Sequence, residues 1–284
     1  MKNILLASTA LVLSAGVAAA DVTVGGSGRM GVTYDNSAVD KMAFTSRIRI
    51  SFSGSGETDG GLQFGGSIRA DNAPAGNAGT GGSVFIAGDF GRITMGDTSG
   101  AAEYIVGDLH GVGLTGIGDL NENAYLSNGG AVARSAMRYQ YTLDGLKLAL
   151  SIDNPGGGNE VYSIGAGYEF DGFGIGIGHE RNNVASANHT IGYVSYSLSN
   201  VDLKATYGDA TGAVSAQYGL SASATFDAVG VSAFVRRDFT DLTHYGIGGS
   251  YDLGGGAALK GGIVRQELAV GDATRADFGI AFDF

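Results

Sequence analysis

The feature that most constrains the fold is an alternation of polar and apolar residues that recurs along the chain. Successive side chains of a strand point to opposite faces, so this alternation predicts strands with one apolar and one polar face. Sixteen such runs are separated by turn signals. They span approximately residues 22–34, 43–57, 61–73, 82–89, 92–98, 134–143, 146–153, 160–170, 173–182, 188–198, 201–208, 214–227, 229–238, 243–253, 256–266 and 273–284. The sequence therefore predicts an all-β chain.

The joints between these runs alternate in length. Short joints rich in Gly, Asp and Asn, which suit tight hairpins, lie at 58–61, 90–92, 144–146, 171–173, 199–201, 227–229 and 254–256. Longer polar joints lie at 35–42, 74–81, 154–159, 183–187, 209–213, 239–242 and 267–272. An antiparallel meander with tight turns at one end and longer loops at the other is typical of a transmembrane β-barrel. A soluble sandwich has no reason to sort its loops by end.

Residues 42–57, "MAFTSRIRISFSGSGE", show what the two faces carry. Ile48, Ile50 and Phe52 fall on one face, while Arg47 and Arg49 fall on the other. By itself this stretch also fits the edge of a soluble sandwich with a basic outer face. A sixteen-stranded barrel, however, is too wide for side chains to fill, so its polar inner face implies a water-filled lumen. We therefore expect the arginines to line a pore.

The start and the composition of the chain agree with a bacterial envelope protein. Residues 1–20 combine Lys2, a short apolar run and a small-residue end at 18–20, which predicts a cleaved signal peptide and a barrel domain over 21–284. The chain has no cysteine, which excludes a disulfide-stapled domain. Its net charge of −11 excludes a basic nucleic-acid footprint. Only 16% of its residues are charged, yet 13 Tyr and 13 Phe argue against disorder despite 51 Gly.

One joint is far longer than the others. Residues 99–133, "SGAAEYIVGDLHGVGLTGIGDLNENAYLSNGGAVA", form a third loop of a length that is usually functional. Its apolar residues, among them Ile105, Val106 and Leu109, predict that it packs against other parts of the chain. Its acidic side chains, which we expect to form a charged edge, are Glu103, Asp108, Asp119 and Glu122.

The sequence contains no convincing catalytic or cofactor-binding motif. A GxGxxG match at Gly26, Gly28 and Gly31 lies inside a predicted strand instead of between a strand and a helix, so we read it as chance. The four histidines have no metal-ligand spacing, and no Ser/His/Asp grouping stands out. We therefore expect no enzyme activity, no metal and no cofactor from the motifs.

The basic residues of the inner face do form a pattern. Arg29, Arg47, Arg49 and Arg69 come from three successive predicted strands and all fall on the polar face. Neighbouring strands would bring them together as a cluster, and guanidinium groups stay charged in such company. The alternative is that they only pair with carboxylates of the long loop and fix its position.

Several segments together resemble the general diffusion porins of the purple-bacterial (alphaproteobacterial) type. They are "GRMGVTYD" (28–35), "TSRIRISFSGSGETDGGLQFGGSIRA" (45–70), "FGRITMGDTSGAAEYIVGDL" (90–109), "YDLGGGAALKGGI" (251–263) and the terminal "FGIAFDF" (278–284). The resemblance implies a homotrimer of sixteen-stranded antiparallel barrels whose third loop folds into the lumen as a constriction. It also implies that basic wall residues face acidic residues of that loop.

Carried over by position, the wall residues would be Arg29, Arg47, Arg49 and Arg69, and the constriction loop would contribute Glu103 and Asp108, with Asp119 and Glu122 beyond the best-matched stretch. Some relatives bind calcium on this loop, and the loop here has fewer acidic residues than the loop of some relatives. The terminal Phe284 resembles the aromatic signal that the barrel-assembly machinery reads.

These observations predict a multi-pass protein of the bacterial outer membrane that contacts lipid and passes small polar solutes and ions passively. Negative net charge and acidic loop residues predict a modest preference for cations. The alternative is an outer-membrane barrel with a surface role, either an adhesin or a membrane-bound hydrolase.

Overall fold

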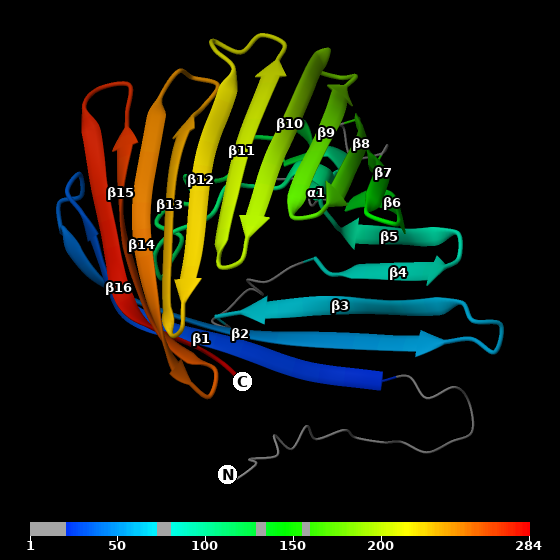
Figure 1. Cartoon of the computed structure of the whole chain (residues 1–284), viewed down its shortest axis with the longest axis horizontal. Coiled ribbons are helices and arrows are strands. Elements are labelled where there is room, and N and C mark those ends of the chain that lie inside the picture. Colours follow the sequence, from blue (N-terminus) through cyan, green and yellow to red (C-terminus); the bar gives the residue numbers. More distant parts are fainter. Residues whose placement is uncertain (1–20, 73–80, 129–134, 155–159) are drawn as a thin grey trace.

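A single antiparallel sheet closes into a barrel (Figure 1). The computed structural model describes residues 21–72, 81–128, 135–154 and 160–284. Each strand pairs with its neighbours in the sequence, and β1 closes the barrel against β16. The strands are β1 (Asp21–Asp35), β2 (Met42–Glu57), β3 (Gln63–Asp71), β4 (Ser83–Gly88), β5 (Gly91–Asp97), β6 (Ser135–Leu143), β7 (Leu146–Asp153), β8 (Val161–Phe170), β9 (Phe173–Asn182), β10 (Ala187–Leu198), β11 (Val201–Ala210), β12 (Gln217–Phe226), β13 (Val229–Arg237), β14 (Thr243–Gly254), β15 (Ala257–Glu267) and β16 (Asp272–Asp283).

The sixteen-stranded antiparallel barrel is confirmed, and the predicted strand ends differ from these bounds by at most three residues. The predicted signal peptide at 1–20 and the end of the long loop at 129–133 lie outside the described residues. Glycines of the GxGxxG match lie within β1, which excludes the phosphate-binding turn that the motif would need.

Tight turns join the strands at one end of the barrel. In the two-residue turn between β6 and β7, Asp144 and Gly145 have φ of 46° and 83°, and Asp171 and Gly172 between β8 and β9 have φ of 46° and 81°. Positive φ at both central residues is the type I′ geometry, which matches the twist of the flanking strands. These turns fix the register of each hairpin and so decide which side chains face inward.

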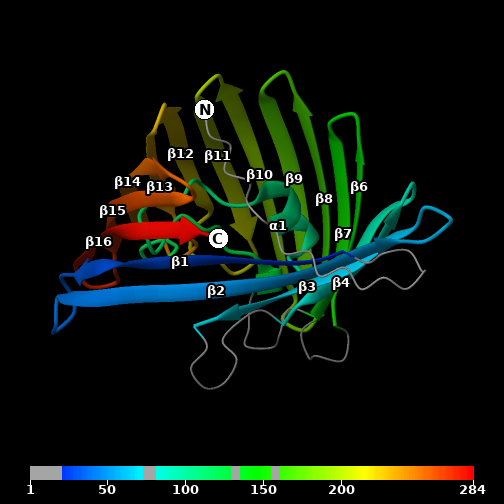
Figure 2. The same ribbon diagram turned by 90° about the horizontal axis from the view of Figure 1, so that it is seen from below.

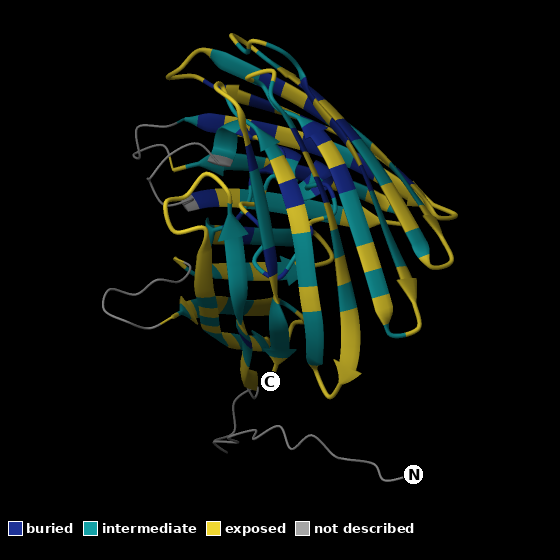
Figure 3. Cartoon of the chain, turned by 90° about the vertical axis from the view of Figure 1, so that its left-hand side faces the viewer, coloured by how far each residue is buried: buried dark blue, intermediate teal, exposed yellow. Residues whose placement is uncertain are grey.

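The two faces of the wall differ as the alternation predicts (Figure 3). Large apolar side chains are exposed on the outside, for example Phe44 (94%), Ile48 (51%) and Phe278 (57%). Inner positions carry small and polar residues, and in β9 every inner residue is buried while every outer one is exposed. A soluble barrel would bury its apolar set, so this outer surface suits a hydrocarbon medium.

The segment between β5 and β6 packs against the inner face of the wall (Figures 1 and 2). It contains α1 (Ala101–Val106), which contacts β7, β8, β9 and β10, and the 3-10 turn η1 (Leu126–Asn128). Within the described ranges, no helix is long and apolar enough to cross a membrane. The buried apolar core of the protein therefore lies inside the barrel, between this segment and the wall.

Candidate functional site

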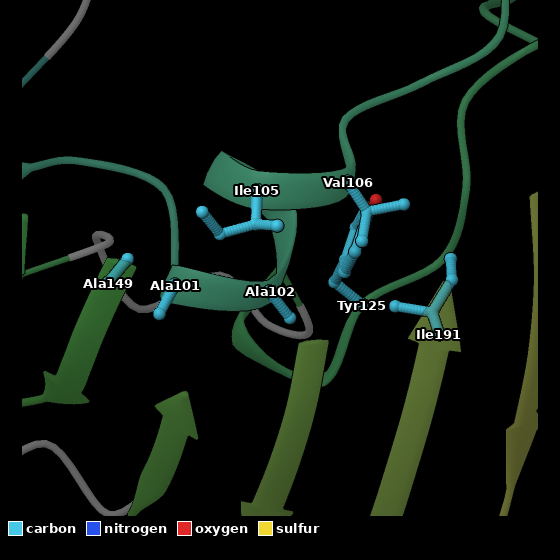
Figure 4. Close-up of a cluster of buried hydrophobic side chains, with 7 residues drawn as sticks. All are labelled: Ala101, Ala102, Ile105, Val106, Tyr125, Ala149 and Ile191. Atoms are coloured by element: carbon cyan, nitrogen blue, oxygen red, sulfur yellow. The ribbon is translucent and has the colours of Figure 1, made fainter. Parts of the chain in front are cut away.

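Two apolar clusters fasten the inner segment, residues 99–128, to the wall. One is shown in Figure 4 and consists of Ala101, Ala102, Ile105, Val106, Tyr125, Ala149 and Ile191. The other consists of Leu109, Val112, Ile117, Phe234 and Val264. The apolar residues that made packing of this loop expected, Ile105, Val106 and Leu109, are all buried. Burial of this kind holds a long loop in one position on the barrel wall.

Glycines make room for α1 on the wall. A methyl group at Gly178 would lie 2.5 Å from the Cα of Ala102, and one at Gly165 would lie 2.7 Å from the Cγ1 of Ile105. Both glycines lie on the inner face, in β9 and β8. The helix backbone can approach the sheet this closely only because no Cβ intervenes.

Side chains of the wall also satisfy the ends of α1. The N–H of Ala101 donates to Ser151 Oγ and the N–H of Ala102 donates to Ser163 Oγ, both at 2.8 Å. At the other end, the Lys204 ammonium donates to the carbonyl of Val106. The first N–H groups and last carbonyls of a helix have no partners inside it, so the wall supplies what this six-residue helix lacks.

The returning part of the inner segment is held by two buried polar side chains. Glu180 Oε2 accepts from the N–H of Leu126 at 2.8 Å, and Glu180 Oε1 accepts from Ser127 Oγ at 2.8 Å. Glu180 also lies 2.9 Å from the Nδ1 of His189. Gln217 pairs with both backbone groups of Ala124, accepting from its N–H and donating to its carbonyl, each at 2.9 Å. Glu180 and Gln217 are fully buried, so these contacts are shielded from water.

The middle of the segment is fixed on the opposite side of the barrel, at β16 and β1. Asp277 accepts from the N–H of Leu114 at 2.9 Å, and its other oxygen accepts from the N–H and hydroxyl of Thr115 at 2.6 and 2.7 Å. Arg29 Nη1 donates to the carbonyl of Leu114 at 3.3 Å. The segment therefore follows the inner face of the wall from β7 round to β1, touching β12 at His110, β13 at Gly111 and β16 at Leu114 on the way.

The four predicted wall arginines lie together. Arg29 and Arg47 are directly opposite each other in the β1–β2 register. Arg49 Nε and Arg69 Nε both contact the carboxylate of Asp71, at 2.9 and 2.7 Å. Asp71 was not among the predicted site residues, and it partly neutralises two of the four cations. Arg29 reaches the inner segment, whereas Arg47 makes no hydrogen bond or ion pair to a described residue.

Three of the predicted loop acids lie beside cations on the wall that the segment covers. Glu103 interacts electrostatically with Arg138, Asp108 with Lys204, and Glu122 with Arg236. Asp108 also accepts from the N–H of Asn123 at 2.8 Å.

The fourth predicted acid, Asp119, interacts electrostatically with Arg29 of the arginine cluster. Asp119 and Glu122 are exposed, and Glu103 and Asp108 are half-buried. The charges thus form neighbouring pairs around the interior instead of one acidic loop opposite one basic wall.

Burial changes the titration of two residues of the inner segment. Burial raises the pKa of Tyr125, and the neighbouring Asp108 and Glu103 raise it further; its hydroxyl donates to the carbonyl of Gly107 at 2.8 Å. Burial lowers the pKa of His110, which Lys204 lowers further while Asp202 opposes this. Among the described residues, no group of three or more His, Asp or Glu side chains comes together in a way that could hold a metal ion.

The anchoring residues Glu180, Gln217 and Asp277 were missed as a group by sequence reasoning. They lie on three separate strands and contact residues up to 163 positions away. Their only signal in the sequence is a charged or amide side chain on an inner face whose other residues are small. The same signal is expected of residues that line a pore.

The comparisons with known proteins agree with this geometry. The Gram-negative porin family matches residues 7–268. A porin from Rhodobacter capsulatus is 32% identical over 93% of this chain and all of its own length, and one from Fuscovulum blasticum is 23% identical with the same coverage. A porin structure refined at 1.8 Å superposes with a TM-score of 0.81 at 31% identity, covering 93% of this chain and all of that one. This chain therefore belongs to the Gram-negative porin family.

Proposed function

We propose that this porin is a weakly cation-selective channel whose narrowest part lies between residues 99–128 and the arginine cluster of β1–β3. As a member of the porin family it is a passive channel of the outer membrane and not an enzyme. The observation that carries the proposal is the inner segment itself, which lines the wall from α1 to the Asp277 anchor and has Arg29 and Arg47 on the wall beside that anchor.

The charges favour a weak selectivity over a strong one. Asp71 shares Arg49 and Arg69, so the cluster has less net positive charge than four arginines would give. Asp119 and Glu122 are both exposed. Asp119 interacts with Arg29 of the arginine cluster, and Glu122 interacts with Arg236 of β13. Charges of both signs across an aqueous gap create a transverse field, and the net negative charge of the chain enriches cations at the mouths.

We also propose that three copies assemble side by side through the wall at β4–β5, the two shortest strands of the described sheet. Strand β4 has only six residues, about 20 Å at 3.4 Å per residue. The apolar band of an outer-membrane barrel is about 25 Å tall, so this part of the wall is too short to face lipid alone. A neighbouring copy would cover it, whereas the longer strands β8–β16 would meet lipid.

The end of the chain supports a role for Phe284 in assembly. Its N–H donates to the carbonyl of Gly26 at 2.9 Å and its carbonyl accepts from the N–H of Gly26 at 2.7 Å, so it completes the closing seam of the barrel. Phe284 is 61% exposed. We infer that an exposed terminal aromatic residue at this seam is what the barrel-assembly machinery binds.

Recording of single channels in planar bilayers tests the proposal. We expect stable steps of conductance and, under a tenfold gradient of KCl, a reversal potential of cation sign well below the limit of about 59 mV for a perfectly selective pore. The double variant Arg29→Ser/Arg47→Ser should move this potential further toward cations. A barrel that inserts but stays electrically silent would favour the alternative of an adhesin or a membrane-bound hydrolase.

A further inference from the structure

A polar hollow lies inside the barrel on the side of the inner segment that faces the tight turns. It has a volume of about 270 Å³. Four hydroxyl side chains and one ammonium line it, from Ser223, Thr225, Ser232, Ser250 and Lys260, and Gly111 and Gly113 of the inner segment border it. It is separate from the arginine cluster, which belongs to β1–β3.

The sheet register places these side chains next to one another. Ser223 of β12 is opposite Ser232 of β13, and Ser250 of β14 is opposite Lys260 of β15. Between them Gly230 leaves the hollow open, because a methyl group there would lie 2.5 Å from Ser250 Oγ. The hydroxyls therefore form a patch beside the ammonium.

Most of these groups are available to a solute. Ser232 Oγ donates to the carbonyl of Gly111 at 2.8 Å, but within the described ranges the side chains of Ser223, Ser250 and Lys260 make no hydrogen bond or ion pair. Among the described residues that line the hollow, Lys260 is the only charged one. The nearby carboxylate of Asp277 is already engaged by the backbone of Leu114 and Thr115.

We propose that this hollow is a transit site for small polyhydroxylated carboxylates such as sugar acids. Lys260 would pair with the carboxylate, and the serine and threonine hydroxyls, which both donate and accept, would bind the hydroxyls of the solute. One ammonium without arginines or a nest of N–H groups suits a monoanion better than a phosphate. The volume is below that of pockets for drug-sized ligands, so the solute is small. The inference rests on the proposed channel function, because the solute reaches the hollow through the lumen.

Block of the ion current by D-gluconate in planar bilayers tests the site. We expect gluconate to reduce the current saturably, and glucose, which has no charge, and butyrate, which has no hydroxyl, to act only at much higher concentrations. Lys260→Met should raise the half-blocking concentration of gluconate at least tenfold, about 1.4 kcal/mol. Ser223→Ala with Ser250→Ala should raise it about fivefold, as expected for two lost hydrogen bonds, and leave butyrate unchanged.

Lys147→Met is the matched control. Lys147 also lies on the inner face close to the tight turns, but it pairs with Glu169 at 2.6 Å and lies outside the hollow. Equal weakening by Lys147→Met and Lys260→Met would overturn the site in favour of general attraction of anions, and so would equal block by gluconate and butyrate. Normal conductance with no gluconate block would overturn the site alone. Loss of all conductance in the unmodified protein would instead refute the channel.

Discussion

The carboxylate of Asp277 should hold the middle of the inner segment on the wall, and Asp277→Ala should release it. Asp277 is 6% exposed and receives three hydrogen bonds from Leu114 and Thr115. A hydrogen bond to a charged group contributes about 1.5–3 kcal/mol. Water in the lumen can hydrate the freed N–H groups, and two of the three bonds share one carboxylate oxygen. We therefore count two bonds, each at about 1.5 kcal/mol, the lower limit of that range. Local docking should then weaken by about 3 kcal/mol, on the order of 100-fold in the opening equilibrium.

Amide hydrogen exchange followed by mass spectrometry in detergent micelles measures this opening directly. The amides of Leu114 and Thr115 should exchange on the order of 100-fold faster in Asp277→Ala, while β-strand amides keep their rates. Asp272→Ala is the control, since Asp272 lies on the same strand but pairs with Arg265 at 2.5 Å, away from the inner segment. Unchanged exchange at Leu114 in a variant that still shows the folded gel mobility before boiling would refute the anchoring role.

Three further results are expected. Asp119→Asn with Glu122→Gln should move the reversal potential toward anions at 0.1 M salt and much less at 1 M, since the screening length falls from about 10 Å to about 3 Å; an unchanged potential at low salt would place these acids away from the ion path. Burial would raise the pKa of Asp238, but hydrogen bonds from Thr240, from the side chain of His244 and from the N–H of Leu242 keep it below its usual value. This stabilises the β13–β14 loop above about pH 3.9, and the gain is lost as pH falls through the lowered pKa, so proteolysis of this loop should rise only in that acid range. Deleting Phe284 should reduce assembly in the outer membrane more than secretion, as fractionation of cells would measure; equal assembly would contradict the role in assembly.

The barrel and its two faces could be predicted because each depends on local features of the sequence. A period of two needs only a strand's own residues, and tight turns such as Asp144–Gly145 fix the pairing of each hairpin. The grouping of Arg29, Arg47 and Arg49 follows in the same way, since strands that are adjacent in sequence are adjacent in the sheet.

The inner segment could not be placed in the same way. Its contacts join residues that are far apart in the sequence, such as Leu114 and Asp277, and no period or turn signal relates two such positions. Asp71 was overlooked because a lone aspartate at the end of a strand gives no hint that two arginines share it. The helix α1 was also missed, although "AAEYIV" has apolar residues at the spacing of one helical face and no turn residue.

The contact between α1 and Gly178 is the point where the inner segment has least freedom to adjust. A Cβ at Gly178 would meet both the Cα and the Cβ of Ala102 at 2.5 Å, and backbone atoms cannot give way as a flexible side chain can. Gly178→Ala should therefore push α1 off the wall or destabilise the protein by about 1–3 kcal/mol, as overpacking does. Gly54→Ala is the matched control, because the nearest atom to its new methyl group, Val22 Cγ2, is 4.0 Å away. Thermal unfolding in detergent and single-channel conductance should both change in Gly178→Ala and not in Gly54→Ala. If the two variants have the same unfolding temperature and the same single-channel conductance, α1 does not pack against the wall at this glycine.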